Sequence, residues 1–217
     1  MSKDWRTEGL LNFGIFQPHT AEGKYEIPVI APEYELLSVE WLGYNYARGT
    51  KQGEGKGVHF FLDDYQFSAL WNNPIQTTDG LMKFGAVMSP DFSTYTDMPM
   101  ILQIYNHYRK HWLAQYWQSR GLKVIPTISW SDHRSFEWCF DGEPGGGVVA
   151  ISTIGCERDK EAFGLFSAGY SEMLDRLRPA HILVYGKRFD FMTEKITVIE
   201  PFHKAMERRR NNGRQRG

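Results

Sequence analysis

Short apolar runs without polar alternation are the feature that most constrains the fold of this chain. They recur between longer segments with helical periodicity, and they are rich in Val, Ile and Phe. Strands that are buried on both faces have this pattern, and they belong to parallel sheets covered by helices. The runs are Val58–Leu62, Phe84–Met88, Lys123–Ile128, Val148–Thr153 and His181–Tyr185.

Two of the intervening segments have a clear apolar stripe with the period of an α-helix. The first lies between Pro99, a typical helix start, and Gly121, a typical helix end. The second begins near Phe163 and ends before Pro179. Strand–helix–strand units of this kind cross over right-handedly and give a parallel sheet with helices packed on it.

The predicted fold class is therefore α/β, a mostly parallel sheet with helices packed on it, of the open or incomplete-barrel type. Further strands are predicted at Asn12–Phe16, Glu26–Ile30 and Leu37–Leu42. A closed β/α barrel is the alternative, but such barrels usually need about 250 residues. The first 57 residues also contain too few helical segments for regular β/α repeats.

Composition predicts a single α/β domain over residues 1–202. Hydrophobic residues make up 41% of the chain, enough for a sizeable core. Residues 1–57 form an N-terminal part that ends in the glycine-rich segment Gly49–Gly57, and residues 58–187 form the core of βα units. Residues 203–217 form a basic tail with six Lys/Arg and one Glu, which leaves the other 202 residues with a net charge of −6.

The N-terminus carries no signal-peptide pattern, and no apolar run is long enough to cross a bilayer. Two cysteines, Cys139 and Cys156, are too few for a disulfide framework. These features predict a cytoplasmic protein without membrane contact.

Polar side chains follow most of the predicted strands. Because the carboxyl ends of parallel strands share one edge, where ligands bind in both candidate architectures, these side chains are expected to line one rim. Asp63, Asp64 and Asp91 are the candidates for catalysis, as general acids and bases or as ligands of Mg²⁺ or Mn²⁺. The candidate substrate-binding residues are Ser89, Tyr95, Ser129, Asp132 and Lys187. The alternative is that such residues only cap helices and satisfy loop amides.

Three other motifs are interpreted as structural. His107 and His111 have the i, i+4 spacing of zinc proteases, but no Glu follows His107, and both are expected on a solvated helix face. The turn Gly142–Gly147 resembles a phosphate loop only in composition. Cys156 would need a nearby base and a helix N-terminus to act as a nucleophile.

The basic tail offers a contact to nucleic acid, with a solubilising tail as the alternative. The cations in question are Arg208, Arg209, Arg210, Arg214 and Arg216.

Several segments resemble domain of unknown function family 4417. They read HFFLDDYQFSALWNNP, KFGAVMSPDFSTYTDMP, YWQSRGLKVIPTISWSD and SFEWCFDGEPGGGVVAISTIGC, and they span about residues 57–187. The resemblance implies a protein of a phage, prophage or plasmid, working in the host-cell cytoplasm. It favours a nucleotide or nucleic-acid setting by association.

Two functional hypotheses follow. The first is a hydrolase that acts on a nucleotide or nucleic acid through the strand-end carboxylates. The second is a non-catalytic factor that binds a host or phage protein through the same polar rim. The sequence does not predict the oligomeric state.

Overall fold

Two parallel sheets form the centre of the protein in a computed structural model, which describes residue 9 and residues 11–201. The first sheet has the order β3 (Glu40–Gly43), β4 (Lys56–His59), β5 (Ala86–Met88) and β6 (Val124–Ile125). The second has the order β7 (Val148–Ser152), β8 (His181–Tyr185) and β9 (Ile196–Ile199). All neighbours within these two sheets are parallel, as predicted.

A short bridge joins the two sheets. Thr127, just beyond β6, pairs in parallel with Ala150 of β7. The amide of Ala150 donates to the Pro126 carbonyl, and the amide of Ile128 donates to the Ala150 carbonyl, both at 2.8 Å. The strands thus run in one series from β3 to β9, and among the described residues β3 and β9 do not pair. The incomplete barrel is confirmed, and the closed barrel is wrong because no ladder joins the two outer strands.

The series of strands curves around an apolar interior of its own. Phe61, after β4, stacks on Tyr185 of β8 with ring centroids 4.9 Å apart, although these strands are not neighbours in a sheet. The same cluster includes side chains from all strands between β5 and β9: Met88, Ile125, Val148, Ala150, Leu183 and Ile199. This packing explains why the five apolar runs lack polar alternation, since both faces of the strands are covered.

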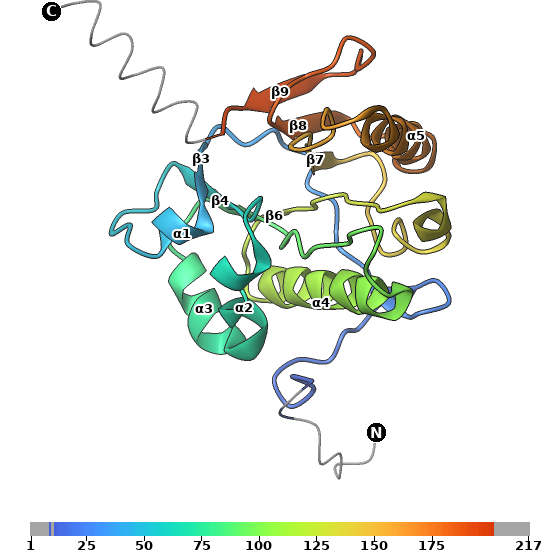
Figure 1. Ribbon diagram of the computed structural model, residues 1–217. Coiled ribbons are helices and arrows are strands. Elements are labelled where there is room, and N and C mark those ends of the chain that lie inside the picture. The colour runs from blue at the N-terminus through green and yellow to red at the C-terminus, as the bar shows by residue number, and fades with distance from the viewer. Residues whose placement is uncertain (1–8, 10, 202–217) are drawn as a thin grey trace, which may run out of the picture.

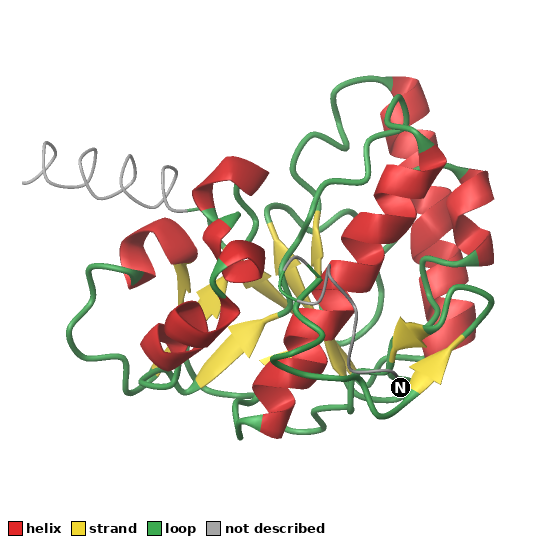
Figure 2. Cartoon of the chain, turned by 90° about the horizontal axis from the view of Figure 1, so that it is seen from below, coloured by secondary structure: helices red, strands yellow, loops and turns green. Residues whose placement is uncertain are grey.

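Helices cover the outside of the curved sheet. The longest are α4 (Met100–Ser119) and α5 (Lys160–Leu177), which match the two predicted helical segments. Figure 1 shows α4 below the strands and α5 beside β7 and β8. In the view from below, the long helix α4 crosses in front of the strands (Figure 2). The shorter helices are α1 (Tyr44–Ala47), α2 (Ala69–Asn72), α3 (Pro74–Leu81), η1 (Asp64–Gln66) and η2 (His133–Glu137).

The helix ends follow from local sequence. Pro99 lies at the N-cap of α4, and Gly121 has a φ of 89°, which only glycine adopts without strain. Asp159 caps α5 by accepting from the amide of Ala162 at 2.8 Å. The aromatic side chains of α4 between Trp112 and Trp117 are buried and pack in the core.

The N-terminal part contains fewer strand residues than the sequence predicts. Asn12–Phe16 is a turn and not a strand, because Asn12 has a φ of 61° and its carbonyl accepts from the amides of Ile15 and Phe16. The region Glu26–Ile30 contributes only β2 (Ile27–Pro28), which pairs antiparallel with β1 (Ala21–Glu22). Strand β9 (Ile196–Ile199) was not predicted, although its four β-branched residues are typical of a strand.

Candidate functional site

The segments that follow β4 and β5 meet at the carboxyl edge of the first sheet, as the parallel topology requires. Asp64 joins them: its Oδ1 accepts from the Ser93 amide at 3.1 Å and from the Ser93 hydroxyl at 2.8 Å. Its Oδ2 lies 3.7 Å from a guanidinium nitrogen of Arg109 on α4. Asp64 therefore connects both strand-end loops to the helix.

Asp91 interacts electrostatically with Asp64, and its pKa is strongly shifted. Burial raises the pKa of Asp91 to about 7; the Lys110 ammonium opposes this rise and the Asp64 carboxylate adds to it. The residue remains partly exposed. A carboxyl with a pKa near neutrality can both take up and release a proton under physiological conditions. Asp91 thus meets the chemical requirement of a general acid–base group.

Arg109 supplies a cation next to these two acids. Its guanidinium carbon lies 3.7 Å from the centroid of the Phe92 ring, which holds the side chain flat against the loop after β5. The side chain is 18% exposed, and its buried Nε has no hydrogen-bond partner among the described residues. An arginine with an unused donor at a rim is suited to bind an anion. We call Asp64, Asp91 and Arg109 the rim group.

The third predicted acid, Asp63, is placed differently. It is exposed at the N-cap of η1 and accepts a long hydrogen bond, 3.5 Å, from Gln66. The structure therefore brings Asp64 and Asp91 into electrostatic contact and leaves Asp63 apart. Binding of Mg²⁺ or Mn²⁺ by the three acids stays a prediction.

The predicted substrate-binding residues are scattered. Ser89 is fully buried, and its hydroxyl accepts from the Thr127 amide at 2.7 Å, which cross-links β5 to the end of β6. Asp132 caps η2 by accepting from the Arg134 amide. Lys187 is exposed and pairs with Glu157 at 2.9 Å. Tyr95 is exposed, and Ser129 is partly exposed. The arginines of the predicted nucleic-acid contact, Arg208, Arg209, Arg210, Arg214 and Arg216, lie outside the described residues.

The polar face of α4 contradicts the prediction of a solvated surface. His107 is 3% exposed and His111 is fully buried. The reason is that the N-terminal segment around β2 packs on this face, and Gln115 donates to the carbonyls of Thr20 and Val29. Backbone groups of another segment form hydrogen bonds with the polar side chains of this helix face. The periodicity of apolar residues therefore does not reveal that the face is buried.

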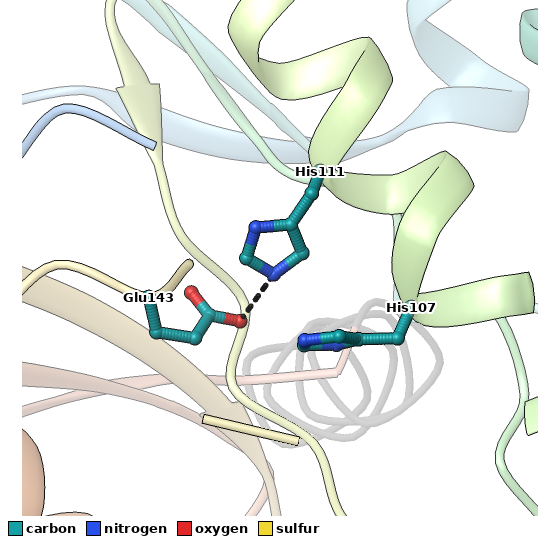
Figure 3. Close-up of side chains that lie close together, drawn as sticks. All are labelled: His107, His111 and Glu143. Atoms are coloured by element: carbon teal, nitrogen blue, oxygen red, sulfur yellow. Dashed lines mark hydrogen bonds and ion pairs between the residues drawn. The ribbon is translucent and has the colours of Figure 1, made fainter. Parts of the chain in front are cut away.

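A buried ionic network occupies this face (Figure 3). Glu143, from the turn before β7, accepts from Lys110 Nζ at 2.5 Å, and the same Oε1 lies 3.0 Å from His111 Nε2. Lys110 Nζ also donates to the Thr127 carbonyl at 2.9 Å. His107 lies one helical turn before His111, with ring centroids 4.3 Å apart. We call His107, His111 and Glu143 the buried cluster.

Gly142 makes room for this cluster. It has a φ of 74°, and a Cβ at this position would lie 2.7 Å from the Pro28 carbonyl oxygen and 2.9 Å from His111 Nδ1. Only glycine allows β2, the turn and the histidine to approach so closely. The glycine-rich turn, which resembles a phosphate loop only in composition, therefore places Glu143 against α4.

The sequence contained one signal of this cluster, the i, i+4 pair of histidines. Their partner Glu143 is 32 residues further along the chain from His111, and nothing in the sequence links it to α4. Cys156, the other discounted candidate, is not at a helix N-terminus, and burial together with Glu157 raises its pKa to about 11. That thiol stays protonated and is a poor nucleophile.

A separate hollow of about 330 Å³ lies between α1, α2 and α3. It is lined by both apolar and polar side chains, including Tyr44, Arg48, Asn73, Lys83 and Phe84. Its lining includes neither the rim group nor the buried cluster. None of the helices in the described part of the chain is both long and apolar enough to cross a bilayer.

The fold and this site define an α/β protein with an incomplete parallel barrel and polar side chains at the carboxyl edge of its strands. The chain belongs to the family described as Domain of unknown function (DUF4417), which matches residues 19–203. This range extends beyond the segments that carried the resemblance on both sides.

Curated relatives come from bacteriophages. The Gene 1 protein of Mycobacterium phage L5 is 40% identical over 165 residues, which cover 75% of this chain and 72% of that protein. The Gene 1 protein of Mycobacterium phage D29 is 39% identical over 189 residues, which cover 84% of this chain and 69% of that protein. No solved structure matches the chain.

Proposed function

We propose that the protein is a hydrolase that acts on a nucleotide or nucleic acid at the rim group. The observation that carries this proposal is that Asp91, which interacts electrostatically with both Asp64 and Lys110, has a pKa of about 7. Ligands of parallel α/β folds bind at this edge of the sheet. Its relatives are phage proteins, so the proposed place of action is the cytoplasm of the host cell.

Each member of the rim group has a role in this proposal. The partly exposed guanidinium of Arg109 binds a phosphate oxygen of the substrate. Asp91, once ionised, takes a proton from the attacking water and later releases it. Asp64 positions Arg109 and holds the loop after β5 through Ser93. Mg²⁺ or Mn²⁺ bound by the rim carboxylates would add a Lewis acid at this edge.

The test is hydrolysis of nucleoside triphosphates and of labelled single-stranded DNA and RNA oligonucleotides, with Mg²⁺ or Mn²⁺ present. The Asp91→Asn variant keeps the shape of the side chain and loses the proton acceptor, so its rate is expected to fall by about 10²- to 10⁴-fold. Asp79→Asn is the control, because Asp79 is an exposed acid on α3 that pairs only with Arg120. A folded Asp91→Asn variant with the full rate would contradict the proposal.

A second candidate function is binding of a host or phage protein without catalysis. Large side chains are exposed in the loops after β4 and β5 and at the start of α4, namely Tyr65, Tyr95 and Ile101. Exposed aromatic and aliphatic side chains next to a polar rim are typical of a protein interface. If no substrate of the panel is hydrolysed and the Tyr65→Ala/Tyr95→Ala double variant loses a partner that the unmodified protein captures, this second function replaces the first.

A further inference from the structure

The buried cluster contains a conflict in protonation that no residue of the rim group explains. His111 Nδ1 lies 2.8 Å from the Pro28 carbonyl, and Nε2 lies 3.0 Å from Glu143 Oε1. Both partners are acceptors, so both ring nitrogens need a hydrogen, which makes the ring a charged imidazolium. A neutral ring carries only one hydrogen, so one of these two contacts then lacks a donor.

Glu143 likewise offers more acceptor oxygens than the neighbouring donors use. The carboxylate is fully buried, and Lys110 and His111 both contact Oε1. The other oxygen, Oε2, has no hydrogen-bond partner among the described residues. A buried carboxylate oxygen without a partner costs free energy and is rare in folded proteins. The cluster therefore has room, in hydrogen-bonding terms, for one more cation.

His107 is held in the orientation of a ligand. Its Nε2 lies 3.0 Å from the Asp141 carbonyl oxygen, so Nε2 carries the hydrogen and Nδ1 carries the lone pair. A backbone carbonyl that fixes one ring nitrogen and leaves the other for an ion is the usual outer shell of a metal-binding histidine. His111 has the same arrangement with Pro28.

We propose that His107, His111 and Glu143 bind one divalent first-row transition-metal ion, of which Zn²⁺ is the best-suited example. In the part of the chain that the structure describes, this is the one group of three such side chains whose ligand atoms all lie within 4.8 Å of one another. A tetrahedral Zn²⁺ ion, with bonds of about 2.0–2.2 Å, needs its ligand atoms about 3.3 Å apart. Small side-chain rotations meet that requirement.

The chemistry of the ligands selects the class of ion. Two neutral imidazoles and one carboxylate suit Zn²⁺ and its neighbours in the first transition row, whereas Mg²⁺ and Ca²⁺ prefer oxygen ligands. The ion takes the place of the missing hydrogen at His111 Nε2, and Glu143 can keep its hydrogen bond with Lys110. The carboxylates of Asp91 and Asp141, which interact with Lys110 and His111, offset part of the added positive charge.

Such an ion would hold together segments that lie far apart in the sequence. Two ligands come from α4 and the third from the turn before β7, while Pro28 of β2 and Asp141 orient the rings. Because the unfolded chain does not present these groups together, binding of the ion stabilises the folded protein. This site goes beyond the proposed hydrolysis and is independent of it, since binding is measured without any substrate.

The test is titration of the full-length protein with Zn²⁺ after dialysis against a chelator, using a competing chromophoric chelator. One tight site per chain is expected, with a melting temperature that rises with Zn²⁺ and not with equimolar Mg²⁺. In His107→Gln, the side-chain amide can still donate to the Asp141 carbonyl, but the ligand is lost. Its affinity for Zn²⁺ should fall by more than about 100-fold, since even outer-shell changes cost about 10- to 100-fold.

His181→Gln is the matched control, because His181 is a partly buried histidine on β8 that contacts Thr197. It should bind Zn²⁺ like the unmodified protein. A readout that needs no variant is the visible spectrum with Co²⁺, which should show the intense bands of a tetrahedral site with nitrogen ligands. Absence of those bands, or unchanged Zn²⁺ affinity in a folded His107→Gln variant, would overturn the proposal.

Discussion

The rim group and the buried cluster both include residues of α4, yet they differ in burial and in hydrogen-bonding capacity. Arg109 belongs to the rim group and is 18% exposed, whereas the next residue, Lys110, is 2% exposed and pairs with Glu143. The Arg109 and Asp64 side chains of the rim are partly exposed, and Arg109 Nε has no hydrogen-bond partner among the described residues. The cluster is closed and has spare acceptor capacity in Glu143. We propose the rim for substrate binding and the buried cluster for a fixed cation, and this difference in burial and hydrogen bonding is the basis of both proposals.

The largest expected effect concerns the buried ion pair. Lys110→Ala leaves Glu143 charged, buried and without its cation, so the free energy of unfolding should fall by about 3–5 kcal/mol. Lys187→Ala removes an exposed ion pair with Glu157 and should cost less than about 1 kcal/mol. Urea unfolding of both variants, in the presence of chelator, measures the difference. Equal effects of the two substitutions would show that burial of the Lys110 pair does not matter.

The second prediction tests the turn that carries Glu143. Gly142→Ala forces a side chain into a position with a φ of 74° and 2.7 Å from the Pro28 carbonyl, so it should destabilise the protein by about 2 kcal/mol or more. Gly164→Ala is the control of opposite sign. Gly164 lies inside α5 with no neighbour within 4 Å of the added carbon, so alanine should stabilise by up to about 1 kcal/mol. Thermal unfolding of the two variants checks both signs.

The third prediction uses the raised pKa of Asp91. A carboxyl whose pKa is higher in the folded state, here about 7, contributes stability below its unfolded value and loses it as the pH rises through 7. The unmodified protein should therefore lose stability relative to Asp91→Asn between pH 4 and pH 8. Because Asp91 is partly exposed, the difference should be about 1–2 kcal/mol. Melting curves of both proteins across this range measure it, and parallel curves would contradict a raised pKa.

The contrast between the two regions also explains how far the sequence could predict the molecule. The five central strands and both long helices follow from local patterns, because buried parallel strands and amphipathic helices leave those patterns in any context. Asp64 and Asp91 could be placed together from topology alone, since the ends of parallel strands meet at one edge.

The buried cluster could not be predicted in this way. His107 and His111 look like residues of a solvated face until it is known that the segment around β2 packs over them. That contact spans more than 80 residues of sequence, as the bond between His111 and Pro28 shows. Strand β9 was missed for a different reason: its run of four residues is short, although its β-branched composition is typical of a strand.

The most direct test of the account is the hydrolysis rate of Asp91→Asn with Zn²⁺ bound, measured on a preparation whose metal content is known. The account predicts one Zn²⁺ per chain, as in the unmodified protein, and a rate lower by at least about 100-fold. Full metal content with an unchanged rate would contradict the claim that the rim group performs the reaction.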